Sequence, residues 1–403
     1  MLTPHKKRFF PDSRTPAVFL FSAWYPTEFY PLNGNFVQNH AGAISKLTQI
    51  TVIHPYEDIS YTQKQALTLQ EEKKGNLVEI RIRYKGVKIR NLFGKLLRSI
   101  RTHRAYRKGI ALAIQKYGLP DITHVNILTR TVWPAFILKW KYHIPYIITE
   151  HWSRYLPERN SYQGIFRKIL TRYAVRKAAA VTTVSAQLKE AMRRHHLDHP
   201  NWHIVPNVIN DSLFFPFPVE KQKKVMLHVS TLNDPIKNIS GILRTIQRLS
   251  VLRNDFELIV IGNEHYLPFA KSLADRLQIL DKYVFFQEEA PNEQLPFYYN
   301  YSDFHLLFSN FETQGLVLIE SFACGKPVVA TRTGGIVDIV HDDNGVLVPP
   351  KNEDELLRAM VYMLDNHQHY NPQLIRDYAV ENFGENRVGN LFLSIYQQSI
   401  THV

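Results

Sequence analysis

The sequence predicts an α/β protein with two Rossmann-like, doubly wound domains that face each other across a cleft. In both halves of the 403 residues, short apolar runs of strand length alternate with longer segments of helical periodicity. The short runs are apolar along their whole length, which is typical of strands buried on both faces of a parallel sheet. The net charge also divides, with +20 in residues 1–214 (33 Lys and Arg against 13 Asp and Glu) and −7 in residues 215–403 (16 against 23). These observations indicate two domains in series.

The first half is expected to hold six strands and four helices. The strands are expected at residues 17–24, 49–56, 77–84, 122–126, 145–151 and 180–185. The helices are expected at residues 36–47, 92–117, 132–142 and 162–179. Residues 206–218 are punctuated by prolines, contain no long periodic segment and form a natural linker. We therefore place an N-terminal domain at residues 1–212 and a C-terminal domain at residues 213–385.

The second half repeats the alternation of strands and helices. Its strands are expected at residues 225–231, 256–262, 283–287, 303–309, 327–331 and 345–349. Its helices are expected at residues 238–253, 266–279, 292–301 and 352–366, with one ending at residue 324 and a short one near residues 335–340. In such sheets ligands bind beyond the carboxyl ends of the strands, so the site is expected in the loops that follow strands.

The composition excludes several classes of protein. With 45% hydrophobic and 21% charged residues, the chain has enough apolar material for two cores, which excludes disordered, collagen-like and small disulfide-rich proteins. The one cysteine, Cys324, cannot form an internal disulfide or a thiolate zinc site, which favours a reducing compartment. No apolar run reaches the ~20 residues of a membrane span, and residues 17–25 lack a signal-peptide cleavage site. We therefore expect a cytoplasmic protein.

The densest motif lies between residues 309 and 327. A strand ends in a polar loop, Gly315 stands near a helix start, and Gly325 with Pro327 ends that helix. Amide groups at a helix start form an anion site. Glu312 lies in the loop and Glu320 about two turns along the helix, ~12 Å away at 1.5 Å per residue. This spacing suits a nucleotide sugar, with phosphates at the helix start, ribose at Glu320 and sugar hydroxyls at Glu312; the alternative is two solvated helix-face charges.

The stretch that contains these glutamates resembles a known family. Residues 312–350, with Gly334-Gly335, Asp338-Ile-Val and Asn344-Gly-Val-Leu-Val-Pro, closely resemble the C-terminal domain of family 4 glycosyltransferases, the retaining, group 1 enzymes of the GT-B fold. Weaker matches lie upstream at His228-Val-Ser-Thr-Leu-Asn-Asp-Pro-Ile-Lys-Asn, near Ser185 and at Asn207. The resemblance covers most of residues 180–365.

The resemblance implies roles for individual residues. Glu312 and Glu320 become the two glutamates of the Glu-x7-Glu element, and Lys237 becomes the diphosphate-binding lysine. The family usually has an arginine about five residues before that lysine, where this sequence has Thr231 or Leu232. A lysine and a helix dipole would then hold the diphosphate.

Further site residues are expected at other strand ends. The catalytic set is Glu312, Lys237 and His151, which ends a predicted strand and which the resemblance places against acceptor or sugar. The donor-binding set is Glu320, Gly315, Leu316, Gln314, Thr313, Gln287 and Gly34. His124 is a weaker candidate of the same kind as His151, and either histidine could instead be structural. No metal or cofactor is expected besides the nucleotide-sugar substrate.

The first half contains a basic segment, residues 88–116. Its cations recur mostly at every third position, and its aliphatic residues lie between them. The cations between Lys88 and Lys116 are Arg90, Lys95, Arg98, Arg101, Arg104, Arg107 and Lys108. In one interpretation, the cations form a solvated helix face and the apolar residues face the core. In the other, the segment contacts an anionic membrane surface.

The expected function is transfer of a sugar from a nucleoside-diphosphate sugar to a glycan or lipid-linked acceptor in surface polysaccharide or glycoconjugate synthesis. The enzyme would work in the cytoplasm, peripheral to the inner face of the membrane. The alternatives are a nucleotide-sugar epimerase, another GT-B enzyme such as a phosphorylase, or a basic nucleic-acid-binding protein. Because no zinc-finger, helix-turn-helix or RNP pattern is present, no nucleic-acid partner is expected. The apolar stripe that includes Val388, Phe392 and Tyr396 needs a partner surface, and the resemblance implies that residues 386–403 return to the first domain.

Overall fold

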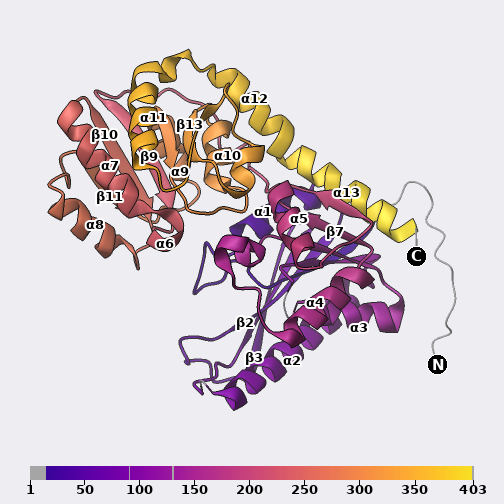
Figure 1. The fold of residues 1–403 in the computed structure, drawn as a ribbon. Helices are drawn as coiled ribbons and strands as arrows, with labels where there is room; N and C mark the ends of the chain where they lie inside the picture. Colours follow the sequence, from indigo (N-terminus) through magenta and orange to yellow (C-terminus); the bar gives the residue numbers. More distant parts are fainter. Residues whose placement is uncertain (1–14, 90, 129–130, 402–403) are drawn as a thin grey trace. The chain divides into compact units, whose positions relative to one another are not determined.

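The structure is a computed structural model that describes residues 15–89, 91–128 and 131–401 (Figure 1). Two sheets with helices on both sides form its framework, which confirms the predicted α/β class with two sheet domains. Arg90 of the basic segment and the ends of the chain, residues 1–14 and 402–403, lie outside the described residues. The described chain separates into two compact units. One comprises residues up to Thr149, Lys177–Val181 and the segment from Gly389; the other comprises Glu150–Arg176 and Thr182–Val388. The boundary expected near residue 212 stays a prediction.

The first sheet has eight strands in the order β3-β4-β2-β1-β5-β6-β7-β8. They are β1 (Val18–Ser22), β2 (Ile50–Glu57), β3 (Leu67–Lys74), β4 (Leu77–Tyr84), β5 (Ile122–Asn126), β6 (Tyr146–Glu150), β7 (Ala180–Thr183) and β8 (Trp202–Ile204). Strands β1, β5 and β6 are buried at every position. Strands β3 and β8 were not predicted, because β3 is a polar, exposed edge strand and β8 has three residues. Since β3 pairs antiparallel with β4, the sheet is not purely parallel.

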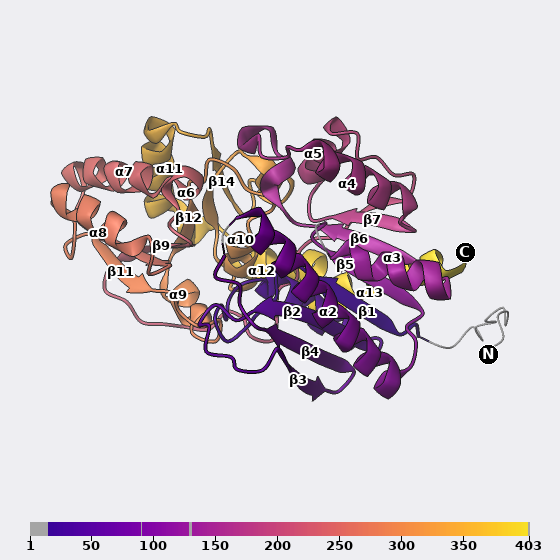
Figure 2. The same ribbon diagram turned by 90° about the horizontal axis from the view of Figure 1, so that it is seen from below.

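The helices of this part of the chain match the predicted ones closely. They are α1 (Asn35–Ser45), α2 (Leu92–Tyr117), α3 (Val132–Tyr142), α4 (Ile165–Lys177) and the unpredicted α5 (Ala186–Arg194), with short 3₁₀ turns η1 (Ser153–Tyr155) and η2 (Pro157–Arg159). Helix α2 lies over β2 and β4, as Figure 2 shows. It docks through small residues, since a Cβ at Gly109 would come within 2.8 Å of Ile53 and Ile82. The small-residue face lets the helix lie close to the sheet.

The last helix, α13 (Glu385–Thr401), contacts the first unit through its aromatic residues. The ring of Phe392 lies 5.1 Å from those of His40 and His124. The hydroxyl of Tyr396 lies 2.7 Å from Nδ1 of His124. The apolar stripe of the sequence is therefore buried, and Phe392 and Tyr396 are fully enclosed.

The second sheet has six strands in the order β11-β10-β9-β12-β13-β14, and every pair is parallel. They are β9 (Lys224–Ser230), β10 (Phe256–Gly262), β11 (Val284–Glu288), β12 (Phe304–Leu307), β13 (Val328–Thr331) and β14 (Gly345–Val348). Its helices are α6 (Asp234–Lys237), α7 (Ile239–Leu252), α8 (Leu267–Arg276), α9 (Leu295–Tyr301), α10 (Leu316–Ala323), α11 (Glu353–Asn366) and α12 (Pro372–Phe383), with 3₁₀ turns η3 (Gly334–Asp338) and η4 (His367–His369). All six predicted strands are present, whereas α12 was not predicted.

Two apolar cores lie on the two faces of this sheet. One contains the inward residues of α7, α8 and α11, and the other contains those of α9, α10 and α12. Strands with continuous apolar content can fill both cores at once, since alternate side chains point to opposite faces. Helix α10, which carries Glu320, is thereby packed along the sheet in the second core.

Candidate active site

The loop between β12 and α10 lies at the carboxyl edge of the second sheet. Gly315 precedes α10 with φ 85° and ψ 68°, a left-handed conformation that favours glycine. Leu316 is the first residue of the helix, and Thr313 is half-buried in the loop. The amide groups of a first helical turn lack intrahelical acceptors, so this helix start can receive an anion.

Lys237 and Glu312 meet at this edge. Lys237 ends α6, the short helix that follows β9, and its ammonium forms an ion pair with Oε1 of Glu312. The hydroxyl of Ser309 donates to the same oxygen over 2.9 Å. The two charged side chains are only 16% and 12% exposed. The structure therefore brings two predicted catalytic residues together from loops after neighbouring parallel strands.

Glu320 lies inside α10 and is 5% exposed. Its Oε2 accepts a hydrogen bond of 2.8 Å from the hydroxyl of Tyr299 in α9, while its Oε1 has no hydrogen bond with any described residue. Burial raises the pKa of Glu320 to about 7, and the bond from Tyr299 opposes that rise. With Glu312 also largely buried, the alternative of two solvated helix-face charges is wrong.

Two buried histidines lie on the strands that carry this edge, and the sequence analysis did not single them out. His228 on β9 contacts the carbonyl oxygen of Leu306 and the hydroxyl of Ser230, each over 2.8 Å. The ring of His305 on β12 stacks on it at 6.4 Å. Burial lowers the pKa of His228 to about 4, so this imidazole is neutral at pH 7. The sequence signal that could have identified them is the presence of one histidine in each of two predicted apolar strands.

The glycine pair of the motif has a packing reason. A Cβ at Gly334 would lie 1.7 Å from the carbonyl oxygen of Glu312. A Cβ at Gly335 would lie 2.3 Å from the carbonyl oxygen of Thr313 and 2.6 Å from Cβ of Ser185. Only glycine lets η3 approach the backbone of the loop this closely, so the pair fixes the position of Glu312.

Other parts of the motif support the loop from behind. The side-chain oxygen of Gln314, which is buried, accepts a 2.8 Å hydrogen bond from the backbone of Asn207. The backbone of Ala186 donates to Asp338 over 3.1 Å. The weaker matches near residues 185 and 207 therefore lie against the loop and η3 within one compact unit. The side chain of Gln314 positions the loop, which leaves its backbone for a ligand.

Leu232 shows why the usual arginine has no counterpart. Its side chain is fully buried in the sheet core, where it packs against Gly262, and its φ is +56°. Thr231 beside it is exposed and uncharged. Lys237 is thus the one cation of the segment from residue 231 to 237.

The remaining predicted residues lie at separate places. Gln287 is exposed near the end of β11, the edge strand, which is three strands away from β12. His151 directly follows β6 and is 6% exposed. Gly34 belongs to the first unit, has φ 78°, and would place a Cβ 2.4 Å from the backbone of Trp24. The weaker candidate His124 is structural, because its ring nitrogens contact Tyr396 and, at 2.6 Å, Thr149 in the core.

Comparisons with known proteins place this geometry in context. The model of group 1 glycosyl transferases matches residues 210–377, and the model of glycosyltransferase family 4 matches residues 34–213. The chain is 27% identical over 290 residues to a probable sucrose-phosphate synthase of Thermosipho melanesiensis, covering 65% of this chain and 67% of that protein. It is 26% identical over 241 residues to N-acetyl-alpha-D-glucosaminyl L-malate synthase of Bacillus anthracis, covering 56% of this chain and 61% of that protein. The chain is 29% identical over 178 residues to an alpha-monoglucosyldiacylglycerol synthase of Streptococcus pneumoniae, covering 43% of this chain and 40% of that protein.

Solved structures share the fold. Sucrose-phosphate synthase from Thermosynechococcus elongatus superposes with a TM-score of 0.76 at 18% identity, covering 97% of this chain and all of that one. Anabaena HepE in complex with UDP-glucose gives a TM-score of 0.66 at 15% identity, again over 97% of this chain and all of that one. These neighbours establish the GT-B fold of this chain.

The raised pKa of Glu320 predicts a pH dependence of stability. Because the folded protein holds this proton up to about pH 7 and the unfolded chain releases it near pH 4.5, the free energy of unfolding falls as the pH rises between these values. The contribution reaches about 3 kcal/mol. Glu320→Gln, whose amide oxygen still accepts from Tyr299, is expected to remove this part of the pH dependence in urea unfolding at pH 5 and 7.5. The exposed control Glu264→Gln is expected to keep the wild-type slope; an unchanged slope in Glu320→Gln would contradict the prediction.

Proposed function

Since the chain belongs to the group 1, family 4 glycosyltransferases, we propose that it transfers a sugar from a nucleoside-diphosphate sugar to a glycan or lipid-linked acceptor. The observation that carries the proposal is the Lys237–Glu312 ion pair beside the start of α10. It puts a cation for a diphosphate and a carboxylate for sugar hydroxyls at one edge of the sheet. We further propose that the anomeric configuration is retained and that the product enters surface polysaccharide or glycoconjugate synthesis.

The donor would exchange partners with the ion pair. A diphosphate that binds the ammonium of Lys237 and the amide groups near Gly315 frees Glu312, whose oxygens then accept hydroxyl groups of the sugar. The Oε1 of Glu320 is available to the ribose. As the bond to the sugar breaks, Lys237 and the helix start stabilise the departing diphosphate, and no metal or cofactor is needed for that role in this proposal.

The acceptor side is assigned to the N-terminal part of the chain, with His151 as the proposed contact to acceptor or sugar. Solved HepE complexes hold UDP and UDP-glucose, which supports a nucleotide-sugar donor. One relative is named for the synthesis of a glucosyldiacylglycerol, which supports a lipid-linked acceptor. Retention would require attack on the face from which the diphosphate departs, because Glu312, once freed from Lys237, accepts sugar hydroxyls in this scheme and does not act as a nucleophile.

Helix α2 supports a place at the membrane surface. Leu92 and Phe93 are 81% and 61% exposed, and Leu96 and Ile100 are exposed as well. The apolar stripe in the first half of α2 therefore does not face the core. Residues Gly94, Ala105, Tyr106, Gly109 and Ala113 form the buried face instead. Exposed apolar side chains among cations are typical of helices that lie on anionic lipid. We therefore propose that the enzyme binds the cytoplasmic membrane face; no described helix has the length and apolarity to cross a bilayer.

The cations of the helix divide into those with partners in the protein and those without an ion pair. Lys116, near the end of the helix, pairs with Glu71 of β3. Arg98 pairs with Glu57 over 3.1 Å, and Arg101 donates to the carbonyl oxygens of Lys85 and Gly86, so these two hold the loop before α2. Lys95, Arg104, Arg107 and Lys108 are exposed and make no ion pair with described residues. The second group is the one available to lipid.

The first test of the proposal is a panel of nucleotides. We expect one nucleoside diphosphate and its sugars, with UDP and UDP-glucose tried first, to raise the melting temperature, because a ligand at 100 times its dissociation constant adds about 2.7 kcal/mol. Release of the diphosphate only when an acceptor is added would identify a transferase. Turnover of the donor without any acceptor would contradict transfer and indicate an epimerase or hydrolase.

Steady-state kinetics separate the roles of Glu320 and Lys237. Glu320→Gln is expected to raise the donor KM about tenfold with little change in kcat, because a ribose contact is equal in ground and transition states. Lys237→Met is expected to lower kcat about 100-fold, because its charge meets the diphosphate as negative charge develops. Lys271→Met on the exposed side of α8 is the control. The reverse pattern of effects would overturn the two assignments.

Vesicle binding tests the membrane proposal. The protein is expected to sediment with phosphatidylserine vesicles at low salt and to leave them above ~0.15 M, where the Debye length is ~8 Å. The combined variant Phe93→Ser, Leu96→Ser, Lys95→Glu and Arg104→Glu is expected to lose this binding and to keep activity on a soluble acceptor. Val251→Ser with Leu252→Ser, an exposed pair at the end of α7, is the matched control. Equal binding by the variant, or equal binding to neutral vesicles, would show that α2 is not the contact.

A further inference from the structure

A pocket of about 380 Å³ lies at the edge of the second sheet opposite the site described above. Its walls are segments that precede strands: residues 216–218 before β9, Asp303 before β12 and residues 324–327 before β13, together with residues from α9 and the α11–α12 connection. Because β9, β12 and β13 are parallel, this edge is the amino end of the strands, whereas Lys237 and Glu312 lie at the carboxyl end. The volume falls within the range of small-molecule sites.

The one carboxylate in the pocket is fully engaged. Asp303 accepts from Nζ of Lys221 over 2.5 Å, from Nε2 of His367 over 2.9 Å and from the backbone of Val225 over 2.7 Å. Burial would raise the pKa of Asp303, but the hydrogen bonds from His367 and Lys221 lower it to about 2. Asp303 is therefore ionised at neutral pH, and its charge is already matched by Lys221.

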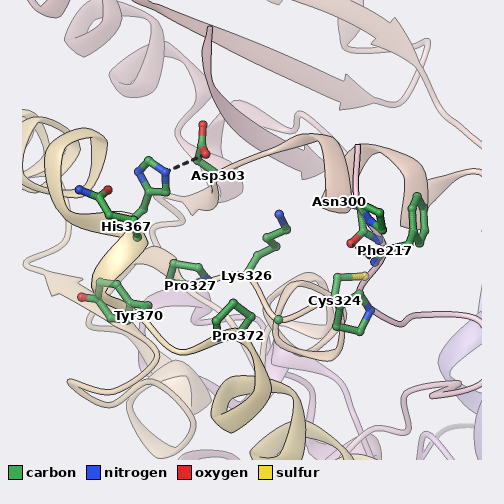
Figure 3. A pocket seen from close by; sticks show the side chains of 13 residues that line it. Phe217, Asn300, Asp303, Cys324, Lys326, Pro327, His367, Tyr370 and Pro372 are labelled. Carbon is green, nitrogen blue, oxygen red and sulfur yellow. Dashed lines mark hydrogen bonds and ion pairs between the residues drawn. The ribbon is translucent and has the colours of Figure 1, made fainter. Parts of the chain in front are cut away.

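Lys326 is a second cation, and it has no such partner. Its ammonium makes no hydrogen bond or ion pair with any residue that the structure describes, although the side chain is half-buried. Figure 3 shows it extending into the open space between His367 on one side and Asn300 and Phe217 on the other. Burial lowers the pKa of Lys326, and the charge of Lys221 adds to that effect. The charge of Asp303 opposes this lowering without cancelling it. An ammonium withdrawn from water with no ion pair of its own is costly, so an anion in this space would be favoured.

Besides the polar side chains of Asn300 and Gln368, the remaining lining is mostly apolar. Phe217 and Tyr370 supply rings, and four prolines, Pro216, Pro218, Pro327 and Pro372, complete the walls. The amide of Asn300 is already used, since it bonds the backbone of Phe215, Pro296 and Phe217. The pocket thus offers the ammonium of Lys326 near its centre and contact surface for a compact ring or hydrocarbon around it.

We propose that this pocket is an effector site for a small organic phosphate. The phosphate group binds the ammonium of Lys326, and the organic body lies against Phe217 and Tyr370. The oxygens of a phosphate group accept charge-assisted hydrogen bonds from an ammonium, and the ester's organic body supplies the contact with the two rings.

The pocket connects directly to the helix that holds Glu320. Residues 324–327 join the end of α10 to β13, and the backbone of Cys324 donates to the carbonyl oxygen of Glu320 over 3.2 Å. A ligand that holds the 324–327 turn acts on the end of α10, whose start and middle form the proposed donor site. Binding of the effector is therefore expected to change the affinity for the nucleotide. This coupling rests on the proposed function, whereas the pocket itself does not.

Calorimetric titration with phenyl phosphate tests the site, with saturating UDP present so that the donor site is occupied. Phenyl phosphate is expected to bind the wild-type protein more tightly than inorganic phosphate or phenol. Lys326→Met, which keeps about the length of the side chain, is expected to weaken binding at least tenfold. This change corresponds to the free energy of one lost hydrogen bond to a charged group. Lys326→Arg is expected to retain binding, and the control Lys271→Met is expected to leave it unchanged. Thermal melting verifies that each variant is folded.

Two results would overturn the site: no binding of phenyl phosphate by the wild-type protein, or equal binding by wild type and Lys326→Met. The effector role is tested by titrating UDP with and without saturating phenyl phosphate, where at least a threefold change in the dissociation constant of UDP is expected. An unchanged constant would overturn that role. If phenyl phosphate binds in a Lys326-dependent way and UDP does not bind, the donor proposal fails and the pocket stands.

Discussion

The parallel arrangement of the second sheet is the constraint on which both proposed sites depend. When all strands run the same way, every loop that follows a strand lies at one edge, and every segment that precedes a strand lies at the other. Lys237 and Glu312 are 75 positions apart in the sequence and meet because each follows one of two neighbouring strands. The same rule gathers Lys221, Asp303 and Lys326 at the amino edge. Helix α10 connects β12 to β13 and therefore runs from the carboxyl edge to the amino edge of the sheet.

Charged groups at the carboxyl edge are matched by partners or by burial within the chain. Lys237 forms an ion pair with Glu312, and Glu320 is buried so deeply that its proton is retained up to about pH 7. Burying unmatched charge is costly, and these arrangements avoid that cost. A nucleotide that binds here replaces an internal partner and does not enter an empty cationic site. Lys326 at the other edge differs, because Asp303 is already matched by Lys221 and His367.

Helix α2 illustrates how packing decides which side of an amphipathic segment faces the core. Its sequence carries large aliphatic residues and cations at similar spacing, and the aliphatic side would ordinarily be assigned to the interior. Instead the buried residues Ala105, Gly109 and Ala113 are small, and Gly109 lets the helix lie close to Ile53 and Ile82 of the first sheet. The large side chains near its start, Leu92 and Phe93, are left on the surface. Because the small residues of α2 face the sheet, its large apolar residues are exposed next to cations that form no ion pair with described residues.

The sequence by itself determined the order of strands and helices, the GT-B family and the identity of the glutamate pair. The order of the elements follows from local patterns: apolar runs, helical periodicity, and the glycines that flank α10. The family and the glutamate pair follow from the resemblance of residues 312–350 to family 4 glycosyltransferases. It missed β3 and β8, because a polar edge strand and a three-residue strand carry little apolar signal. Only the tertiary structure decided that Glu312 pairs with Lys237, that Tyr299 holds Glu320, that His124 is a core residue, and that Lys326 is left without a partner. The physical reason is that partners, burial and the resulting pKa values depend on which distant segments the sheet brings together, and local periodicity does not contain that information.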